Sequence, residues 1–444
     1  MRISRASHTK KTAVIAGLAA MGLALSACGG ETTPTETPSG ESTPTESQAA
    51  PEGEGTESPA PATRDESKDL VIWADQLRAD ALRPFVEQFG EDNGIEVQVQ
   101  FVNNVRGDFS AASQSGTGPD VIVGAHDWLG EFYQNGSVAP INMGAEMEAK
   151  FNPVAQAASK FAGQTFAVPY AIESLALVRN TDLVPDAPAT IEEAVEVGQK
   201  LKEDGKASNA LLVQVGQGGD AYMAYPFLSA FGGGMFAKTE TGDLDPTKPI
   251  VNSAETVKGA EIIEKLGKEG VLSVNIDGDN AIPLFTEGDV PFFVTGPWAI
   301  SQIREAGINY EITPLPATAD GGQMRSFATI NQFYVSANAK NPAIAEEFVL
   351  NVVGDPELQK ALFEVGQRVP ALTEAADALA GDNPELTIWS EAAAAADMMP
   401  NIPEMNAVWG PVGQATADIV KGSLSAQEAM DAAQKNIEQA LGLS

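Results

Sequence analysis

Apolar and polar positions alternate along the chain in a pattern that changes from strand to helix and back, beginning after Asp69. Residues 70–73 form a short apolar run that is typical of a buried strand. Apolar residues then recur every four positions from Leu77 to Phe89, which predicts a helix that ends at Gly94. Residues 95–101 alternate between apolar and polar, as in a second strand. Strand, helix and strand in this order predict a parallel βαβ unit.

The same alternation continues toward the C-terminus. A third strand is expected at residues 121–123, after a turn rich in glycine and proline. Helix starts are predicted at four capping or proline signals: Thr190 with Glu193, Asn341-Pro342, Asp355-Pro356, and Ser425 with Glu428. Gly205 should end the first of these helices, and the last should run toward Leu441. The pattern predicts an α/β fold with mostly parallel sheets.

The N-terminal segment has the features of an export signal rather than of a folded domain. A basic stretch is followed by an apolar run from Thr12 to Leu25, which is too short to span a bilayer stably. The run ends in Leu-Ser-Ala-Cys-Gly, which resembles a bacterial lipobox. We therefore expect residues 1–27 to be a lipoprotein signal peptide and Cys28 to carry the lipid on the outer, extracytoplasmic face of the cell membrane. Cys28 is the only cysteine, so no internal disulfide is expected.

Residues 28–68 differ sharply in composition from the rest. Thr, Pro, Ser, Glu and Gly dominate, and no large apolar side chain occurs between residues 29 and 67. Such a segment buries too little surface to offset its ordering entropy. It is expected to be a disordered, extended tether.

Charge limits the class of partner. The 444 residues contain 27 Lys and Arg against 61 Asp and Glu, a net charge of −34. This balance excludes a nucleic-acid partner, since phosphate binding requires a basic surface. Anionic lipids would repel the chain as well, so membrane contact is expected only through the lipid anchor or a protein partner. The length is sufficient for two lobes with their own cores.

Residue types that usually carry catalysis are scarce. The histidines are His8, inside the signal peptide, and His126, which is either a structural residue or an isolated base. Neither a Ser-His-Asp or Cys-His arrangement nor a multi-histidine metal site can be assembled, and no nucleotide-binding glycine motif is present. We predict no enzyme activity, no metal and no cofactor. Two alternatives remain: a glycoside hydrolase, which needs only two carboxylates, and a receptor for cations such as polyamines.

Tryptophans at strand ends favour a sugar ligand. Pyranose rings stack on flat aromatic side chains, and their hydroxyls bind carboxylates and amides. Trp73, Trp128, Trp298 and Trp409 lie beside predicted turns, several next to acidic residues, whereas Trp389 has a helical context and is expected to be structural. In α/β folds, ligands bind at the carboxyl ends of strands.

Four stretches resemble maltose-binding proteins, the sugar receptors of ABC importers. They are GPDVIVGAHDWLGEFYQNGSVAPI from Gly118, AVPYAIESLALVRNTDLVPDAPATIEEA from Ala167, FTEGDVPFFVTGPW ending at Trp298, and MMPNIPEMNAVW ending at Trp409. They occur in the family's order, and the resemblance runs from about Asp69 to the C-terminus. It implies a two-lobed, type II periplasmic-binding-protein-like fold, a monomer, and ABC permease subunits as partners.

The resemblance also implies lobe boundaries and a binding cleft. The N-terminal lobe would comprise residues 69–171 and 328–381, and the C-terminal lobe residues 172–327 and 382–444. The chain would cross between them near residues 171, 327–328 and 381. Sugar would bind in the cleft at this hinge, and binding would favour the closed arrangement.

Individual site residues are carried over from the same family. Asp75, Asp127 and Glu173 are expected to bind sugar hydroxyls, Tyr222, Trp298 and Trp409 to stack on sugar rings, and Asp220 to make a polar contact near Tyr222. Trp128 and Arg106 are also expected at the ligand, although the family has an arginine and an acidic residue there. Gly124 replaces a family tryptophan. The implied ligand is maltose or a maltodextrin-like oligosaccharide, with trehalose and cyclodextrin as alternatives.

Overall fold

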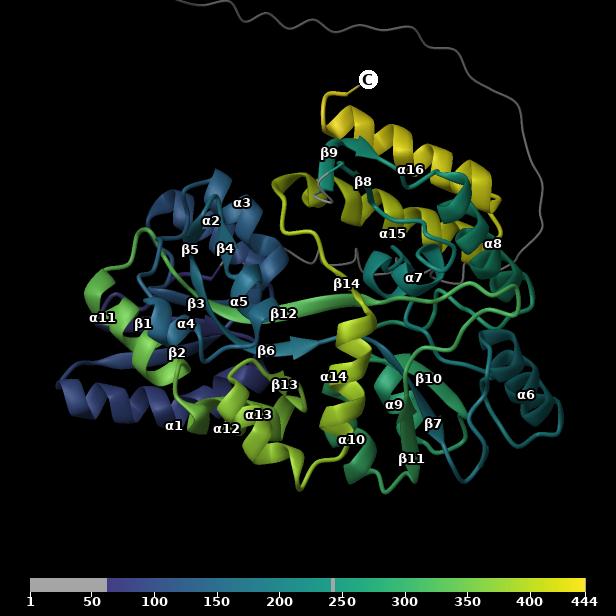
Figure 1. The fold of residues 1–444 in the computed structure, drawn as a ribbon, viewed down its shortest axis with the longest axis horizontal. Helices are drawn as coiled ribbons and strands as arrows, with labels where there is room; N and C mark the ends of the chain where they lie inside the picture. The colour runs from purple at the N-terminus through teal and green to yellow at the C-terminus, as the bar shows by residue number, and fades with distance from the viewer. Residues whose placement is uncertain (1–61, 241–243, 444) are drawn as a thin grey trace, which may run out of the picture. The chain divides into compact units, whose positions relative to one another are not determined.

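The computed structural model describes residues 62–240 and 244–443 (Figure 1). The predicted signal peptide, Cys28 and the tether up to residue 61 lie outside the described residues. The prediction that the tether extends to residue 68 is wrong for its last part. Arg64 is buried and its guanidinium lies 3.1 Å from the fully buried carboxylate of Asp120, and its backbone N–H donates to the Thr117 carbonyl. This ion pair holds the segment on the folded body, and composition alone does not reveal it.

The largest sheet has seven strands. Their bounds are β1 Leu70–Ala74, β2 Val97–Phe101, β3 Val121–Ala125, β6 Ala167–Glu173, β12 Phe327–Val335, β13 Val369–Pro370 and β14 Asp397–Met398. The order is β13-β6-β12-β3-β1-β2, and β14 pairs with the amino end of β12. The strands and helix predicted for the first βαβ unit are confirmed: β1 and β2 are parallel and α1 (Gln76–Asn93) joins them, with Gly94 left-handed at its end.

The expectation of mostly parallel sheets holds only for part of this sheet. Strand β1 is parallel to β2 and β3, whereas β12 runs antiparallel to both β3 and β6. The long strand β12 returns through the sheet between strands that run the other way, as Figure 1 shows at the centre of the molecule. The α/β class is as predicted. The antiparallel position of β12 depends on its pairing with β3, about 200 positions earlier in the chain, and no local sequence pattern indicates it.

The remaining strands form smaller sheets. β7 (Ala176–Asn180), β10 (Phe292–Thr295) and β11 (Tyr310–Thr313) make an antiparallel sheet in the order β10-β7-β11. Two-stranded pairs are formed by β4 (Lys160–Phe161) with β5 (Gln164–Thr165) and by β8 (Phe236–Lys238) with β9 (Leu244–Pro249). Only two residues separate β6 from β7, so β6 leads directly from the large sheet into the three-stranded one.

Sixteen α-helices surround these sheets in the described part of the chain. After α1 they are α2 Val105–Ser115, α3 Leu129–Gln134, α4 Ala145–Glu148, α5 Pro153–Ala158, α6 Ile191–Glu203, α7 Ala221–Leu228, α8 Ala254–Lys268, α9 Ala281–Thr286, α10 Ile300–Glu305, α11 Pro342–Phe348, α12 Pro356–Gly366, α13 Thr373–Ala380, α14 Glu385–Ala395, α15 Asn406–Lys421 and α16 Ala426–Ala440. Short 3₁₀ helices occupy η1 His126–Trp128, η2 Pro297–Ala299 and η4 Pro403–Met405, and η3 Val349–Val353 is a π-helix. None of the described helices has both the length and the apolar character needed to cross a membrane.

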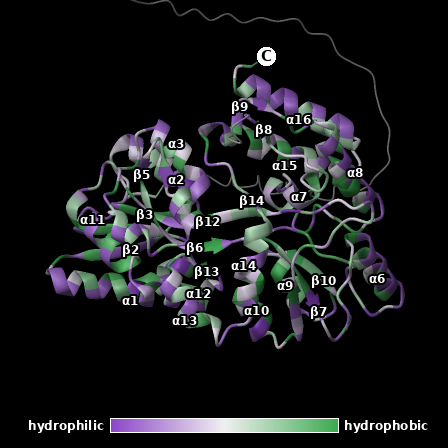
Figure 2. Cartoon of the chain, viewed as in Figure 1, coloured by the Kyte–Doolittle hydropathy of each residue, from purple (hydrophilic) through white to green (hydrophobic). Residues whose placement is uncertain are grey.

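The buried surfaces explain why these elements form. In β1, Leu70 and Ile72 join the core on one side of the sheet while Val71 and Trp73 join the core on the other, because the strand is covered on both faces. Figure 2 shows the corresponding contrast between the hydrophobic strand β6 and the largely hydrophilic outer helices α1 and α16. Of the apolar residues on which the α1 prediction rests, Leu82, Val86 and Phe89 are buried as expected, whereas Leu77 is 41% exposed. Leu77 lies in the first turn of the helix.

Most capping predictions are confirmed at the level of hydrogen bonds. Ser425 and Glu428 form a reciprocal capping box at α16, and Asp355 caps α12 by accepting from the Glu357 N–H at 2.7 Å. At α6 the Thr190 hydroxyl accepts from the N–H of Glu193, but the Glu193 carboxylate accepts from the Ala189 N–H. The helix after Asn341 begins at Pro342 as predicted, but the Asn341 side chain does not cap it.

His126 is a structural residue. Its ring is fully buried; Nδ1 accepts from the Ile330 N–H at 3.1 Å, and Nε2 lies 3.0 Å from the Met399 carbonyl, to which it donates. One tautomer of neutral imidazole satisfies both bonds. Burial lowers the pKa of His126 to about 4, against the smaller opposing effect of these bonds. The ring therefore links β12 to the segment after β14 and is unsuited to act as a base.

This burial predicts a specific pH dependence. The unfolded chain binds a proton at His126 below about pH 6.5 and the folded protein only below about pH 4, so this residue makes stability fall as the pH drops through that window. His126→Gln should lower the free energy of unfolding at pH 7 by about 1–3 kcal/mol through lost backbone bonds. The difference between wild type and variant should shrink between pH 6.5 and 4 in urea unfolding. A difference that stays constant over this range would contradict the prediction.

Candidate functional site

The carboxyl ends of three strands meet at one edge of the large sheet. Because β6 and β3 both run antiparallel to β12, they point in the same direction, and β1 is parallel to β3. Asp75 follows β1, Asp127 follows β3, and Glu173 ends β6. The three carboxylates predicted to bind sugar are thus brought to the same edge, where α/β folds usually bind ligands.

Asp75 belongs to a group of paired side chains that we call the Asp75 cluster: Asp75, Arg78, Tyr170, Glu173, Arg368 and Trp298. Asp75 caps α1 by accepting from the Arg78 N–H at 3.0 Å, and its second oxygen forms an ion pair with the Arg78 guanidinium. The same guanidinium donates to the hydroxyl of Tyr170 and, at 2.8 Å, to Oδ1 of Asn331. Burial alone would raise the pKa of Asp75, but the charge and hydrogen bonds of Arg78 outweigh it and lower the pKa.

Glu173 and Trp298 complete the Asp75 cluster from the other side. The Glu173 carboxylate pairs with the Arg368 guanidinium, and both side chains are about one tenth exposed. The centre of that guanidinium lies 5.7 Å from the Trp298 ring centroid. Arg368 therefore contacts an acidic and an aromatic residue that were both predicted to bind sugar.

A second group, the Asp127 cluster, comprises Arg106, Asp127, Glu131, Asn406 and Trp409. Arg106 lies 3.6 Å from one Asp127 oxygen and 3.0 Å from Glu131, and it contacts the side-chain carbonyl of Asn406. The Asn406 amide donates to Glu131 at 3.0 Å, and Trp409 donates to Asp127. Helices α2, α3 and α15 are joined through these charged contacts.

Asp127 is the most perturbed group of the site. Its side chain is 5% exposed, and burial raises the pKa to about 6 although Arg106 opposes this and Glu131 adds to it. Oδ1 is buried without any hydrogen-bond partner. A buried carboxylate oxygen without a partner destabilises the folded protein when the group is ionised. A hydrogen bond from a donor such as a hydroxyl would offset this cost.

Trp409 and Tyr222 are connected through β12. The Trp409 ring makes an edge contact with Phe327 at 6.0 Å between centroids, and Tyr222 lies 6.2 Å from the same ring. The Tyr222 hydroxyl accepts from Thr329 at 3.4 Å. Both aromatic residues predicted to stack on sugar rings are half-buried and lie beside the same strand.

Trp128 explains the departure at Gly124. A Cβ at position 124 would lie 1.9 Å from the Trp128 ring, so the indole folds back over the glycine. Gly296 and Trp298 show the same arrangement at 2.0 Å. An aromatic side chain thus covers the end of β3 here, although it comes from a residue four positions later than in the maltose-binding family.

Three other predicted positions have mainly structural contacts. Asp220 caps α7 by accepting from the N–H groups of Tyr222 and Met223 at 3.0 Å, so it orients the helix that carries Tyr222. Trp73 is fully buried and donates to Gln100, which removes it from the site. Trp389 is 2% exposed in α14, as expected of a core residue.

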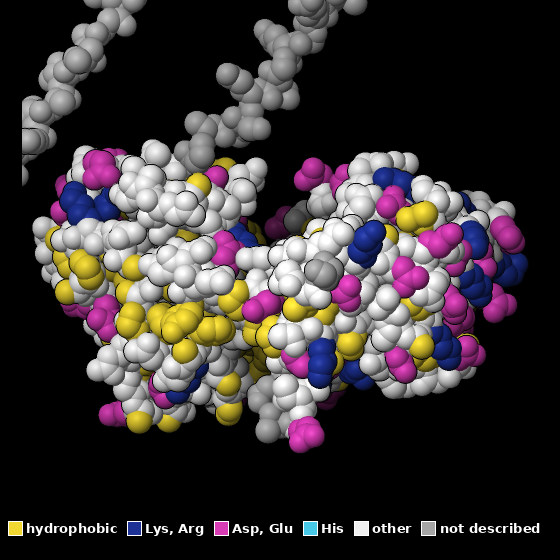
Figure 3. Space-filling view, turned by 90° about the horizontal axis from the view of Figure 1, so that it is seen from above, with side chains coloured by type: hydrophobic (Ala, Val, Ile, Leu, Met, Phe, Trp, Pro, Cys, Tyr) yellow, Lys and Arg dark blue, Asp and Glu magenta, His cyan; other side chains and the backbone are white. Residues whose placement is uncertain are grey.

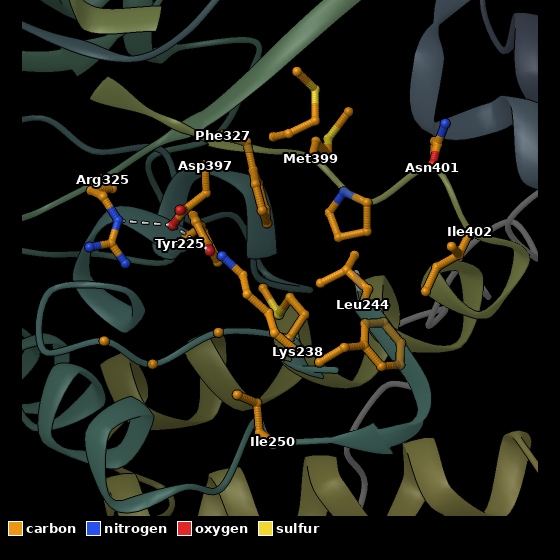
Figure 4. Close-up of a pocket in the computed structure, with 17 residues that line it drawn as sticks. Tyr225, Lys238, Leu244, Ile250, Arg325, Phe327, Asp397, Met399, Asn401 and Ile402 are labelled. Carbon is orange, nitrogen blue, oxygen red and sulfur yellow. Dashed lines mark hydrogen bonds and ion pairs between the residues drawn. The ribbon is translucent and has the colours of Figure 1, made fainter. Parts of the chain in front are cut away.

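Figure 4 shows a cavity next to Phe327, the residue of β12 that Trp409 and Tyr222 contact. It has a volume of about 710 Å³ and is lined by residues such as Tyr225, Arg325, Phe327 and Asp397. Arg325 and Asp397 form an ion pair at 3.0 Å, and the Tyr225 ring stacks on Phe327 at 3.6 Å. Among the described residues, none of the nine predicted ligand residues lines this cavity or any of three smaller cavities.

Sequence reasoning missed Asn331, which accepts from Arg78, and several members of the two clusters: Arg78, Tyr170, Arg368, Glu131 and Asn406. Arg78 had a usable signal, since it lies one helical turn after the capping residue Asp75. The others reach the site only through pairings between distant segments. Within the described ranges, no group of three or more His, Cys, Asp or Glu side chains is arranged to hold a metal ion. On the face in Figure 3, acidic and basic side chains are interspersed.

The chain is similar in sequence to a known protein family and to several known binding proteins. The model for the family described as bacterial extracellular solute-binding proteins matches residues 85–396. The chain is 28% identical over 441 residues to the galactooligosaccharide-binding protein of Bacillus subtilis, covering 96% of each protein. It is 30% identical over 368 residues to the maltotriose-binding protein of Pyrococcus abyssi, covering 80% of this chain and 78% of the relative.

A third relative is the maltooligosaccharide ABC transporter solute-binding lipoprotein of Streptococcus pneumoniae, 25% identical over 442 residues and 97% of each protein. These matches confirm the predicted periplasmic-binding-protein-like class and exclude the hydrolase alternative, since the relatives are binding proteins of transporters. The chain therefore belongs to the bacterial extracellular solute-binding proteins.

Proposed function

We propose that the protein is a lipid-anchored, extracytoplasmic receptor that binds a neutral oligosaccharide and delivers it to the permease of an ABC importer. The observation that carries the proposal is the buried Oδ1 of Asp127, which has no partner and lies in a cluster with Trp409. A sugar hydroxyl would supply the missing donor, and the indole would supply the flat apolar surface. No chemical step is required for this function.

The pairing of charges favours a neutral ligand over a polyamine. In the Asp75 cluster two carboxylates, of Asp75 and Glu173, are matched by the guanidinium groups of Arg78 and Arg368. Arg106 likewise compensates Glu131. Carboxylates that already pair with arginine remain hydrogen-bond acceptors for hydroxyls but offer little net charge to a cation.

Two glycan series are supported by different observations. The resemblance of the aromatic positions and the maltotriose- and maltooligosaccharide-binding relatives favour maltodextrins. The relative that aligns over 96% of both chains binds galactooligosaccharides by its name, which makes β-galactosides the second candidate. We expect the contacts that distinguish the two glycan series to lie at or beside the Asp127 cluster, because family residues are replaced at Arg106 and Trp128.

Anchoring and closure complete the proposal. The lipobox around Cys28 and the lipoprotein relative from Streptococcus pneumoniae support attachment by a lipid. We propose that the receptor acts as a monomer. For sugar to enter, the two clusters have to separate from their present contacts. We infer that the strands β6 and β12 act as the hinge and that bound sugar favours the closed arrangement.

A ligand panel tests the proposal directly. Maltotriose, longer maltodextrins, β-1,4-galactotriose, trehalose, cyclodextrin and spermidine should be compared by thermal shift of the purified protein. The correct oligosaccharide at a hundredfold excess over its Kd should stabilise the protein by about 2.7 kcal/mol and be recovered uncleaved. A response to spermidine alone would refute the sugar receptor.

Asp127→Asn separates stability from function. Folding raises the pKa of Asp127 from its ordinary value of 3.8 to about 6. Ionisation of Asp127 therefore destabilises the empty protein as the pH rises through 6. Removing the charge should raise the free energy of unfolding at pH 7.5 by about 1–3 kcal/mol. The same change should weaken sugar binding at least tenfold, measured by calorimetry.

In the wild type, sugar affinity should fall as the pH drops below about 6, because the protonated carboxyl accepts hydroxyl bonds less well. The Asp127→Asn variant should lack this pH dependence. A variant that binds as tightly as the wild type at pH 7.5 would remove Asp127 from the ligand site.

Trp409→Ala and Trp389→Ala form a matched pair. Trp409 is half-buried at the site, so its removal should weaken sugar binding with a small change in melting temperature. Trp389 is 2% exposed in the core, and its removal should destabilise the protein by about 3–5 kcal/mol while the surviving folded protein binds sugar normally. The reverse pattern of losses would contradict the assignment of Trp409.

A further inference from the structure

Asn331 is the one buried amide of the site whose orientation is determined and whose donor group is left without a partner. It lies in β12, is 3% exposed, and accepts a hydrogen bond from Arg78 at Oδ1. Its Nδ2 is buried and has no hydrogen-bond partner. Buried polar groups in folded proteins are nearly always paired, so this amide requires an explanation.

Arg78 determines which way the amide faces. A guanidinium only donates hydrogen bonds, so Asn331 has to present its oxygen to Arg78 and its nitrogen elsewhere. Arg78 is itself held by Asp75 and by the Tyr170 hydroxyl. The orientation of Nδ2 is therefore set by Arg78 of α1, by Asp75 directly before that helix, and by Tyr170 of β6.

The position of Asn331 places this donor between the two clusters. Its backbone pairs with Ala125, two residues before Asp127, and with Ala171, two residues before Glu173. The unpaired acceptor Oδ1 of Asp127 follows the same end of β3. An unpaired donor and an unpaired acceptor thus lie on neighbouring segments at the edge of the sheet where the carboxylates gather.

We propose that Asn331 is a further ligand-contact residue that determines specificity: its Nδ2 donates to one oxygen of the bound saccharide, and Arg78 is the positioning residue that aims it. This inference rests on the proposed function and adds a donor to a site otherwise described by acceptors and aromatic rings. A site built to bond one oxygen discriminates strongly against a ligand that lacks it, since the buried donor is then left unpaired.

Asn331→Asp is the sharpest test: it keeps the oxygen that faces Arg78 and replaces the amide donor with a second carboxylate oxygen, and the added negative charge is matched by the control variant below. We expect the melting temperature of the empty protein to be unchanged or higher, since Nδ2 has no partner to lose. The Kd for maltotriose or for β-1,4-galactotriose, whichever the wild type binds, should rise at least tenfold. The matched control is Asn180→Asp: Asn180 is 2% exposed and its Nδ2 donates to the Gly288 carbonyl at 3.0 Å, so that variant should lose stability and keep its affinity within threefold.

Monodeoxy derivatives of the bound sugar distinguish a contact from a structural role. The wild type should bind one derivative about tenfold more weakly than the parent, and Asn331→Asp should not show that difference. If Asn331→Asp fails to fold, Arg78→Lys serves instead: lysine keeps the charge but cannot span Asp75, Tyr170 and Asn331, and it should reduce the same discrimination.

Two results would overturn the inference. One is a Kd for Asn331→Asp within threefold of the wild type. The other is unchanged discrimination among the deoxy derivatives in both variants. If the wild type binds none of the sugars of the panel, the proposed function is refuted before any variant is compared, and this inference is refuted with it.

Discussion

Strand β12 is buried along all nine of its residues, and this constraint positions the rest of the site. Its two edges pair with β3 and β6, and its amino end also pairs with β14. A strand so enclosed has to satisfy its backbone N–H and C=O groups internally. His126 does so for the Ile330 N–H, and the Thr329 and Asn331 side chains contact Tyr222 and Arg78. Displacing this strand would therefore disturb both clusters at once.

Charge pairing explains how an acidic protein can concentrate carboxylates in one place. Asp75, Glu173 and Glu131 each have an arginine partner, which removes most of their mutual repulsion. Asp127 shares Arg106 with Glu131 and remains incompletely satisfied, with a raised pKa and an oxygen that has no partner. We interpret this residual instability as the part of the site that is reserved for ligand, in the way that functional sites often sacrifice stability.

Local structure was largely predictable because its causes are local. The βαβ unit, the left-handed Gly94 and the capping box at Ser425 depend on residues within a few positions of one another. The errors arose where distant segments decide the outcome. The burial of Arg64 depends on Asp120, and the direction of β12 depends on strands far earlier in the chain.

For the site, the sequence by itself determined which residue types are available and, through resemblance, which carboxylates and aromatic residues to examine. It also argued against a catalytic triad and a multi-histidine metal site, since histidine and cysteine are nearly missing. Only the tertiary structure decided that Arg78, Arg368 and Arg106 pair with those carboxylates and that Asn331 is held with a free donor. The reason is physical: hydrogen bonds and ion pairs across strands act between residues that are close in space at any separation in sequence, and no periodicity along the chain records them.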